Sequence, residues 1–295
     1  MLRSIIVIFL LISNISVIDV VGINPQTYYY NSNLNNDEDD QDVWVIFIVV
    51  GDSKKESRNI NLLTNIFLEN GCLSSQIFIL NDEQATKEKI LTKPFIWLDN
   101  QNISNNDIIF FYFSMHGSKI EDQLPFDEPD NLDEYLVPYD YDFESGNYII
   151  DDELNEKISL INNQNIVLVF ETCYSGGMID GKSDLAADGR IIITSADVNE
   201  PSWSIYFPSS WLFPHYLIKG LLGPADENND GFISVEESFY YAEIPTVFRS
   251  SILAFFYSLI PLIPHDFFAQ HPQLFDGWPS IENNSKDLLL FELRN

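Results

Sequence analysis

IVLVFETCYSGG, at Ile166–Gly177, is the most informative stretch of this 295-residue chain. Its first five residues are apolar and mostly β-branched or aromatic, which is typical of a buried parallel strand. The strand runs into Glu171, then Cys173, then a turn of small residues. Because ligands bind at the carboxyl ends of strands in open α/β sheets, this stretch predicts a thiol held at a functional edge.

A second stretch has the same design. The apolar run Ile108–Phe113 predicts another buried strand, and Ser114–Ser118 follows it with His116 at its centre. A thiol is a weak nucleophile until a base takes its proton or a cation lowers its pKa. His116 and Cys173, each just past a strand, supply both parts. Cys72 has none of this context, so we expect it to pack in the core.

Further apolar runs predict strands at Val43–Val50, Gln76–Leu80 and Ile191–Ala196. Helical spacing of apolar residues predicts helices near Asn59–Asn70 and Glu83–Asp99. Strands that alternate with helices form parallel βαβ units. The sequence therefore predicts an α/β fold, a three-layer α/β/α sandwich with a mostly parallel sheet.

In this order, the two motifs resemble those of the caspase–legumain–metacaspase clan of cysteine peptidases, which share a caspase-like domain. Ser118 after His-Gly, together with Glu171–Gly176, is closest to the legumain pattern. Asp130–Asp140 and Tyr148–Leu154 look more like metacaspases. The resemblance covers roughly residues 43–205. It implies the same fold and a hydrolase, namely a thiol protease that cleaves inside peptide chains.

The resemblance also implies catalytic roles. Cys173 would attack the peptide carbonyl, and His116 would hold the thiolate and then protonate the leaving amine. The N–H groups of Gly117 and Cys173 would bind the oxyanion of the tetrahedral intermediate. An acyl-enzyme would then react with water.

Four residues look like the clan's substrate-binding positions. Glu171 lies two residues before the thiol, Arg58 resembles a legumain Arg, and Ser195 and Trp203 bound a segment similar to the substrate-binding loop. Glu171 alone would attract Lys or Arg, whereas Glu171 paired with Arg58 would suit Asn. Both specificities stay open, as do structural roles for Arg58 at a helix start and for Trp203 in the core.

Outside these motifs, DENNDGFISVEE at Asp226–Glu237 matches a complete EF-hand-type calcium loop. Gly231 supplies the sharp turn at position 6. The expected metal ligands are Asp226, Asn228, Asp230, the carbonyl of Phe232, Ser234 and Glu237. A single loop of this kind predicts a structural Ca²⁺ rather than a sensor, and no organic cofactor is expected.

The segment Ser118–Asn147 is also acidic. Its residues Asp130, Asp133, Glu134, Asp140 and Asp142 offer hard oxygen ligands, so calcium is an option there as well. A solvated acidic loop is the favoured interpretation.

The chain divides into four segments. Residues 1–22 predict a secretory signal peptide, with an uncleaved anchor as the alternative, and residues 23–42 a flexible acidic leader. Residues 43–215 are the expected catalytic core, and residues 216–295 its C-terminal part. The signal places the protein outside the cell or in the secretory lumen.

The formal net charge of −30 argues against nucleic acid and against anionic membrane surfaces. A peptide or protein substrate is the expected partner. With two Cys, the chain has no disulfide framework. Ser251–Pro264 is too short to span a bilayer; a buried hairpin is favoured there over a membrane-touching insert or a partner surface. His271–Gly277 is expected to be a loop and Asp287–Leu293 an edge strand.

Three other functions compete with a peptidase. A transamidase or peptide ligase of the same clan would use the same Cys and His. A calcium-stabilised binding module would keep the fold without turnover, although the presence of both Cys173 and His116 argues against it. A zinc site lacks the usual Cys and His spacing.

Overall fold

The computed structural model describes residues 41–51, 54–123, 126, 128, 130–179, 185–205, 210–259, 269–281 and 286–293. The expected signal peptide and nearly all of the acidic leader lie outside these residues. Residues 41–295 form one compact unit.

The core of that unit is a twisted sheet with the strand order β12-β8-β7-β3-β1-β2 in the described residues. Its strands are β1 (Val43–Val49), β2 (Ile77–Asn81), β3 (Ile108–Ser114), β7 (Ile166–Glu171), β8 (Arg190–Thr194) and β12 (Gln273–Asp276). All neighbours pair in parallel except β12, which is antiparallel to β8. The mostly parallel sheet expected from the sequence is therefore confirmed.

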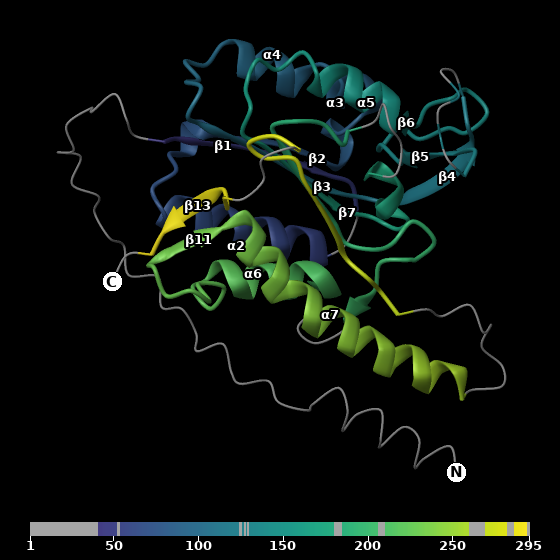
Figure 1. Ribbon diagram of the computed structural model, residues 1–295. Coiled ribbons are helices and arrows are strands. Elements are labelled where there is room, and N and C mark those ends of the chain that lie inside the picture. Colours follow the sequence, from purple (N-terminus) through teal and green to yellow (C-terminus); the bar gives the residue numbers. More distant parts are fainter. Residues whose placement is uncertain are drawn as a thin grey trace. The chain divides into compact units, whose positions relative to one another are not determined.

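Helices cover both faces of the sheet (Figure 1). On one face lie α2 (Lys54–Glu69), α6 (Leu212–Leu221) and α7 (Val235–Ser258), and on the other α3 (Lys87–Ile90), α4 (Lys93–Asp99) and α5 (Asp151–Ile158). Alternate strand residues supply the two cores, with Phe47 packed toward α2 and Phe111 toward the opposite face. These are the three layers that the sequence predicted.

Smaller elements surround these three layers. One is a three-stranded sheet of β4 (Gly117–Glu121), β5 (Leu132–Leu136) and β6 (Ile149–Ile150). Two strand pairs join β9 (Ser204–Ile205) to β10 (Ser210–Trp211) and β11 (Phe232–Ser234) to β13 (Leu289–Glu292), and short 3-10 helices lie at Ser74–Gln76, Asp82–Gln84 and Ser175–Ile179.

The structure corrects several boundaries. The helix expected over residues 83–99 is broken into α3 and α4, because Pro94 has no N–H for the carbonyl of Ile90. The loop expected at His271–Gly277 contains β12, which adds to the edge of the main sheet. The strand expected within Asp287–Leu293 exists as β13, but it pairs with β11.

The buried hairpin expected at Ser251–Pro264 is wrong for its described part. Residues 251–258 are the last turns of α7, and Phe255 is 60% exposed. Pro261 and Pro264 lie outside the described residues. The helix α7 ends at Ser258, before both prolines, although it contains Pro245 in its interior.

Candidate active site

His116 and Cys173 leave neighbouring strands at the same edge of the sheet. β3 and β7 pair in parallel with Ser114 opposite Glu171, and the N–H of Met115 donates to the carbonyl of Glu171 at 3.3 Å. The next residues along both strands are the two motifs. The topology therefore places His116 and Cys173 just past the ends of adjacent strands. His116 is exposed to solvent and Cys173 is half-buried.

Gly117 allows the segment that follows β3 to lie directly against the segment that follows β7. A Cβ at this position would lie 1.9 Å from the hydroxyl of Thr172 and 2.6 Å from the carbonyl oxygen of Cys173. The N–H of Val137 donates to the carbonyl of His116 at 3.0 Å and fixes the backbone on the other side. A side chain at residue 117 would therefore force the His and Cys motifs apart.

The Cys173 thiol lies in a partly desolvated position. Burial raises the pKa of Cys173, while the N–H of Ser202, which donates to Sγ at 3.4 Å, lowers that pKa. Because the raising effect is the larger, the resting thiol is protonated at neutral pH. A thiol in this state would need a base before it could act as a nucleophile, and His116 follows the adjacent strand.

The chain turns sharply after the thiol. Tyr174 has a φ of +62°, which is costly for a residue with a side chain, and its N–H donates to the carbonyl of Glu200 at 2.8 Å. A Cβ on Gly176 would lie 2.4 Å from the backbone nitrogen of Val198. The turn is thus packed directly against the 195–203 segment.

That segment is tied down at both ends. The Ser195 hydroxyl accepts from the N–H of Thr172 at 3.3 Å, and Trp203 is buried against Tyr257, with ring centroids 5.6 Å apart. Gln270 bridges the two ends, donating to the carbonyl of Ser195 at 2.6 Å and accepting from the N–H of Trp203 at 2.9 Å. Trp203 therefore packs in a small core, and Ser195 orients the loop that reaches the thiol.

Glu171 is the last residue of β7 and lies two residues before Cys173. Its side chain is buried, burial raises its pKa to about 8, and the Ser202 hydroxyl donates to its carboxylate. A second buried carboxylate, Glu56 of α2, acts on the same group and adds to the rise. Glu56 accepts from the indole N–H of Trp211 at 3.1 Å.

Arg58 lies elsewhere. Burial lowers the pKa of His215 to about 3, and the positive charges of Lys219, Arg249 and Arg58 act in the same direction. Among the described side chains, the charge that acts on Glu171 is that of Glu56, not that of Arg58. The expected pairing of Arg58 with Glu171 is therefore not what the structure brings together.

The acidic stretch after His116 is split between separate contacts. Lys119 pairs with Glu134 at 3.1 Å and with Asp130 at 3.5 Å. The carboxylate of Asp140 accepts from the N–H of Lys87 at 2.9 Å. The five acids singled out from the sequence thus do not form one set of ligands.

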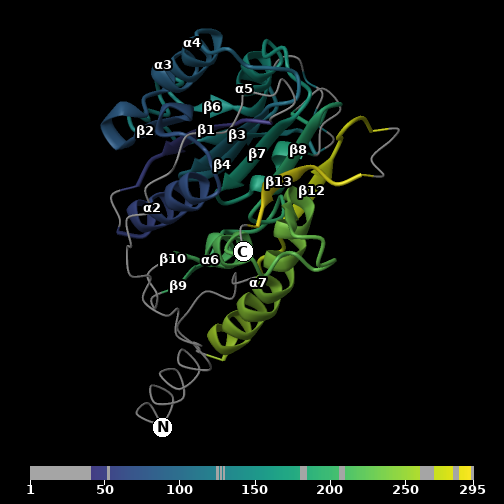
Figure 2. The ribbon, with the colours of Figure 1, turned by 90° about the vertical axis from the view of Figure 1, so that its left-hand side faces the viewer.

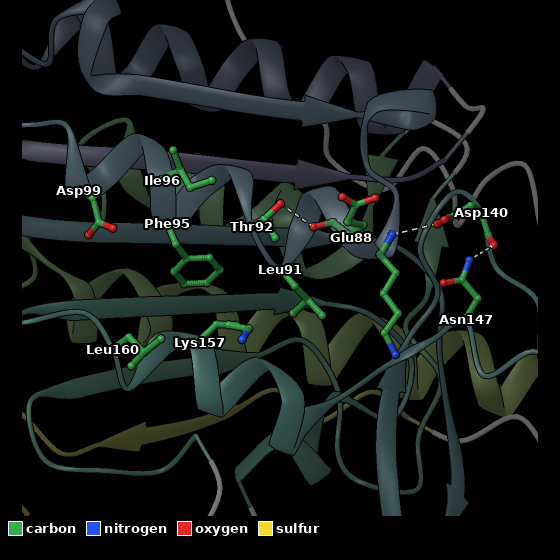
Figure 3. Close-up of a pocket in the computed structure, with 11 residues that line it drawn as sticks. Glu88, Leu91, Thr92, Phe95, Ile96, Asp99, Asp140, Asn147, Lys157 and Leu160 are labelled. Carbon is green, nitrogen blue, oxygen red and sulfur yellow. Dashed lines mark hydrogen bonds between the residues drawn. The ribbon is translucent and has the colours of Figure 1, made fainter.

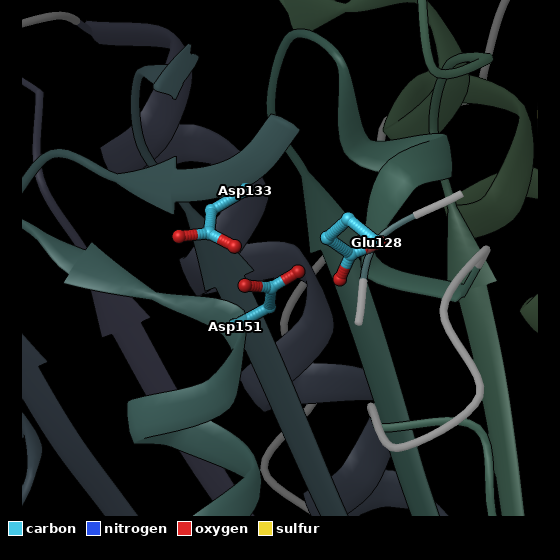
Figure 4. Close-up of side chains that lie close together, drawn as sticks. All are labelled: Glu128, Asp133 and Asp151. Carbon is cyan, nitrogen blue, oxygen red and sulfur yellow. The ribbon is translucent and has the colours of Figure 1, made fainter. Parts of the chain in front are cut away.

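A different acidic group does converge. Glu128, Asp133 and Asp151 are all buried, and their carboxylate oxygens lie within 4.8 Å of one another (Figure 4). Of these three, only Asp133 was among the sequence candidates; Glu128 lies in the same acidic segment, and Asp151 begins α5. Buried carboxylates at this spacing suit a hard divalent cation.

The 226–237 loop has the turn that its sequence predicts. The carboxylate of Asp226 accepts from the N–H groups of Asp230 at 3.1 Å and Gly231 at 3.2 Å. Asn228 accepts from the same Asp230 N–H at 2.8 Å, and Gly231 has a φ of +88°. The carboxylate of Asp230 accepts from the N–H of Phe232 at 2.9 Å.

Glu237 closes this loop by capping a helix. Its carboxylate accepts from the N–H of Ser234 at 3.1 Å and from the Ser234 hydroxyl at 3.2 Å, at the start of α7. Within the described part of the chain, the carboxylates of Asp226, Asp230 and Glu237 are not among the groups that converge within 4.8 Å.

A separate hollow of about 730 Å³ opens between α3, α4 and α5, with Leu91, Phe95 and Leu160 as its apolar lining (Figure 3). Lys87, Lys157 and Asp140 line its polar parts. Of the described residues that line it, none belongs to the Cys173 site.

Comparison with known proteins bears on this geometry. Residues 58–182 match the family model described as metacaspase, peptidase C14 domain. Metacaspase-1 of Candida albicans is 33% identical over 133 residues, covering 41% of this chain and 29% of the relative. Metacaspase-1 of Saccharomyces cerevisiae is 34% identical over 133 residues, covering 42% of this chain and 29% of the relative. The match thus spans less than a third of the length of these curated relatives.

A crystal structure of a Geobacter sulfurreducens protein superposes with a TM-score of 0.50 at 15% identity, covering 80% of this chain and 92% of that one. This likeness supports the fold alone. The resemblance to the clan is confirmed by the matches to metacaspases. Residues 58–182, which carry His116 and Cys173, are thus similar to the peptidase domain of metacaspases.

Proposed function

We propose that this protein is a cysteine endopeptidase that cleaves after Lys or Arg. One observation carries the proposal: Ser202 donates its N–H to the sulfur of Cys173 and its hydroxyl to Glu171. A buried carboxylate is thereby held beside the attacking thiol, where the side chain before the scissile bond would lie.

The reaction would begin when His116 takes the proton of Cys173 and the sulfur attacks the substrate carbonyl. The N–H groups of Gly117 and Cys173 would stabilise the oxyanion, by about 3 kcal/mol for one donor. Imidazolium would then give its proton to the leaving amine as the C–N bond breaks. Water, deprotonated by His116, would hydrolyse the thioester and restore the thiol.

The specificity follows from charge. The pKa of Glu171 is raised mainly by burial, so an incoming guanidinium or ammonium group would favour its ionised form and pair with it. Glu56 adds a second negative partner close by. A pocket for Asn would instead need a cation beside Glu171, and the charge of Arg58 acts on His215.

Calcium binding is part of the proposal. The loop at Asp226–Glu237 has the residue types and the turn for a structural Ca²⁺, and the convergent carboxylates of Glu128, Asp133 and Asp151 would offer a second site. Calcium at the loop would join α6 to α7 and β13. We further propose that residues 1–22 direct the chain into the secretory pathway, which amino-terminal sequencing of the secreted protein would test.

The decisive experiment compares fluorogenic peptides that end in Arg, Lys, Asn or Asp, with and without calcium. We expect cleavage after Arg and Lys that is lost in Cys173→Ala and in His116→Ala. Glu171→Gln is the matched control, because it keeps the shape and removes the charge. Faster cleavage after Asn than after Arg would contradict the proposed pocket.

The same assay separates the competing functions. A transamidase would convert the peptide to a conjugate when an amine nucleophile is added, and mass spectrometry would detect that product. If no peptide is cleaved and an electrophilic probe does not label Cys173, the protein is a binding module instead.

A further inference from the structure

The outer side of α7 is unusually apolar for a surface. Ile244 is 73% exposed, Phe248 68%, and Phe255 and Leu259, just past the helix end, 60% each. At about 100° of rotation per residue, these four side chains fall within an arc of roughly 60°. With the exposed Ser251 between Phe248 and Phe255, they form one stripe along the helix, which we call the α7 stripe.

The stripe is separate from the contacts that hold α7 in place. The inner side of the helix carries Thr246 and Ser250, which are buried, and Ser250 accepts from the N–H of Gln270 at 2.8 Å. Tyr257 packs on Trp203. Figures 1 and 2 both show the second half of α7 extending past the end of the sheet. The α7 stripe therefore lies on the outer side of the helix and is not part of the hydrophobic core.

The charge of this region is opposite to that of the rest of the chain. Between Ile244 and Leu259 the sequence contains Arg249 and no carboxylate, although the chain has 45 Asp and Glu. A binding face without carboxylates, in a protein that is otherwise strongly acidic, suits a partner whose surface is apolar and uncharged. It does not fit a basic partner, which would favour the acidic faces elsewhere.

Size argues against a second copy of the chain as the occupant. At roughly 150–250 Å² for each fully exposed large side chain, four side chains at these exposures offer only about 400–650 Å². A stable protein interface buries about 800 Å² on each partner. Two copies would also bring together chains of net charge −30. A lipid surface needs neither a matching shape nor that area.

We propose that the α7 stripe docks on the surface of a membrane of neutral, zwitterionic lipid, with the helix lying in the plane of the interface. Ile244, Phe248, Phe255 and Leu259 enter the boundary between headgroups and acyl chains. Among the described residues, no helix is long and apolar enough to cross a bilayer, so the contact lies at the interface. The net charge disfavours anionic lipids. The proposal goes beyond peptide cleavage and does not depend on it.

The test is co-flotation of the full chain with phosphatidylcholine vesicles and with vesicles that contain one fifth phosphatidylserine. The stripe variant Phe248→Gln/Phe255→Gln is compared with Ile96→Gln/Leu160→Gln, which removes exposed apolar side chains from α4 and the segment after α5. We expect the wild type and the control to bind neutral vesicles, and to bind the anionic ones less. The stripe variant should bind at least tenfold more weakly.

A second stripe variant, Ile244→Gln/Leu259→Gln, guards against local unfolding, and both variants should keep the wild-type melting temperature because these side chains are exposed. Equal binding of both stripe variants and the wild type would overturn the proposal and point to the apolar amino-terminal segment. Failure of the wild type to bind would also overturn it. So would sedimentation showing a dimer that the stripe variants dissociate, since the occupant would then be a second copy.

Discussion

Replacing Gly117 with Ala is the most direct test of how the two motifs meet. The new Cβ would lie 2.6 Å from the carbonyl oxygen of Cys173, and contacts of a Cβ below 3.0 Å essentially never occur. The Thr172 hydroxyl at 1.9 Å can rotate away, but the carbonyl belongs to the backbone. The His116 segment must therefore move from Cys173 by at least about 0.4 Å. Because β3 and β7 are locked by their ladder, the shift falls on the catalytic groups.

A displacement of about 1 Å costs about 100-fold in rate, so we expect Gly117→Ala to lower kcat/KM for an Arg peptide by roughly 10- to 100-fold. This corresponds to about 1.4–2.7 kcal/mol of transition-state stabilisation. The assay is steady-state hydrolysis, with the alkylation rate of Cys173 at pH 7 as a second readout. Adding Thr172→Ala should restore little activity, because the carbonyl contact persists.

Gly146→Ala is the control, since a Cβ there meets nothing within 4 Å and only the φ of +71° is strained. It should cost about 1–3 kcal/mol of stability and leave kcat/KM unchanged. Wild-type kcat/KM in Gly117→Ala would refute the reasoning. Full rescue by Thr172→Ala would show that the hydroxyl, and not the backbone, limits the approach.

Three further predictions follow from buried or coordinating acids. Burial raises the pKa of Glu171 to about 8, so kcat/KM for Arg peptides should rise as pH increases toward 8, and rise less for matched citrulline peptides or in Glu171→Gln. Burial raises the pKa of Glu236 to about 8 from 4.5, so the folded state holds a proton that the unfolded state loses. The free energy of unfolding should therefore fall as pH rises from 4.5 to 8, by up to about 1.4 kcal/mol per pH unit for this group, and urea titrations of Glu236→Gln should show a flatter slope. Calcium should raise the melting temperature; Glu237→Gln would remove the part due to the 226–237 loop and Asp133→Asn the part due to the buried cluster, and equal calcium responses in both variants and the wild type would refute both sites.

The central strands and the edge at which the site lies could be predicted from the sequence. Parallel strands buried on both faces are continuous apolar runs, so their carboxyl ends at Ser114 and Glu171 are visible as the points where polarity begins. β12 could not be predicted in this way. Its residues are all half-exposed, and it joins the sheet through backbone hydrogen bonds that carry no side-chain signature.

The charged residue that acts on Glu171 could not be predicted from the sequence, for a geometric reason. Glu56 and Arg58 are two residues apart on a helix, so their side chains point about 200° apart. The carboxylate of Glu56 accepts from the indole of Trp211 and acts on Glu171, whereas the charge of Arg58 acts on His215. The motif match made Arg58 a candidate for substrate binding, with a structural role left open, whereas in the structure it is the carboxylate of Glu56 that acts on Glu171. Gln270 was missed because its partners are 67 and 75 residues away along the chain.

Contacts made by the C-terminal part of the chain hold the segment beside the Cys173 thiol in place. Glu237 caps α7 at its start, and β11, within the same loop, pairs with β13 through Ile233 and Phe291. Farther along α7, Ser250 holds Gln270, which bridges the ends of the segment that contacts the Cys173 thiol. A change that tilts α7 must therefore move Gln270 or break its buried hydrogen bonds, at about 1–3 kcal/mol for each group left unsatisfied. Residues 216–295 thus hold the 195–203 segment in place through α7 and Gln270, although all the proposed catalytic residues lie before them.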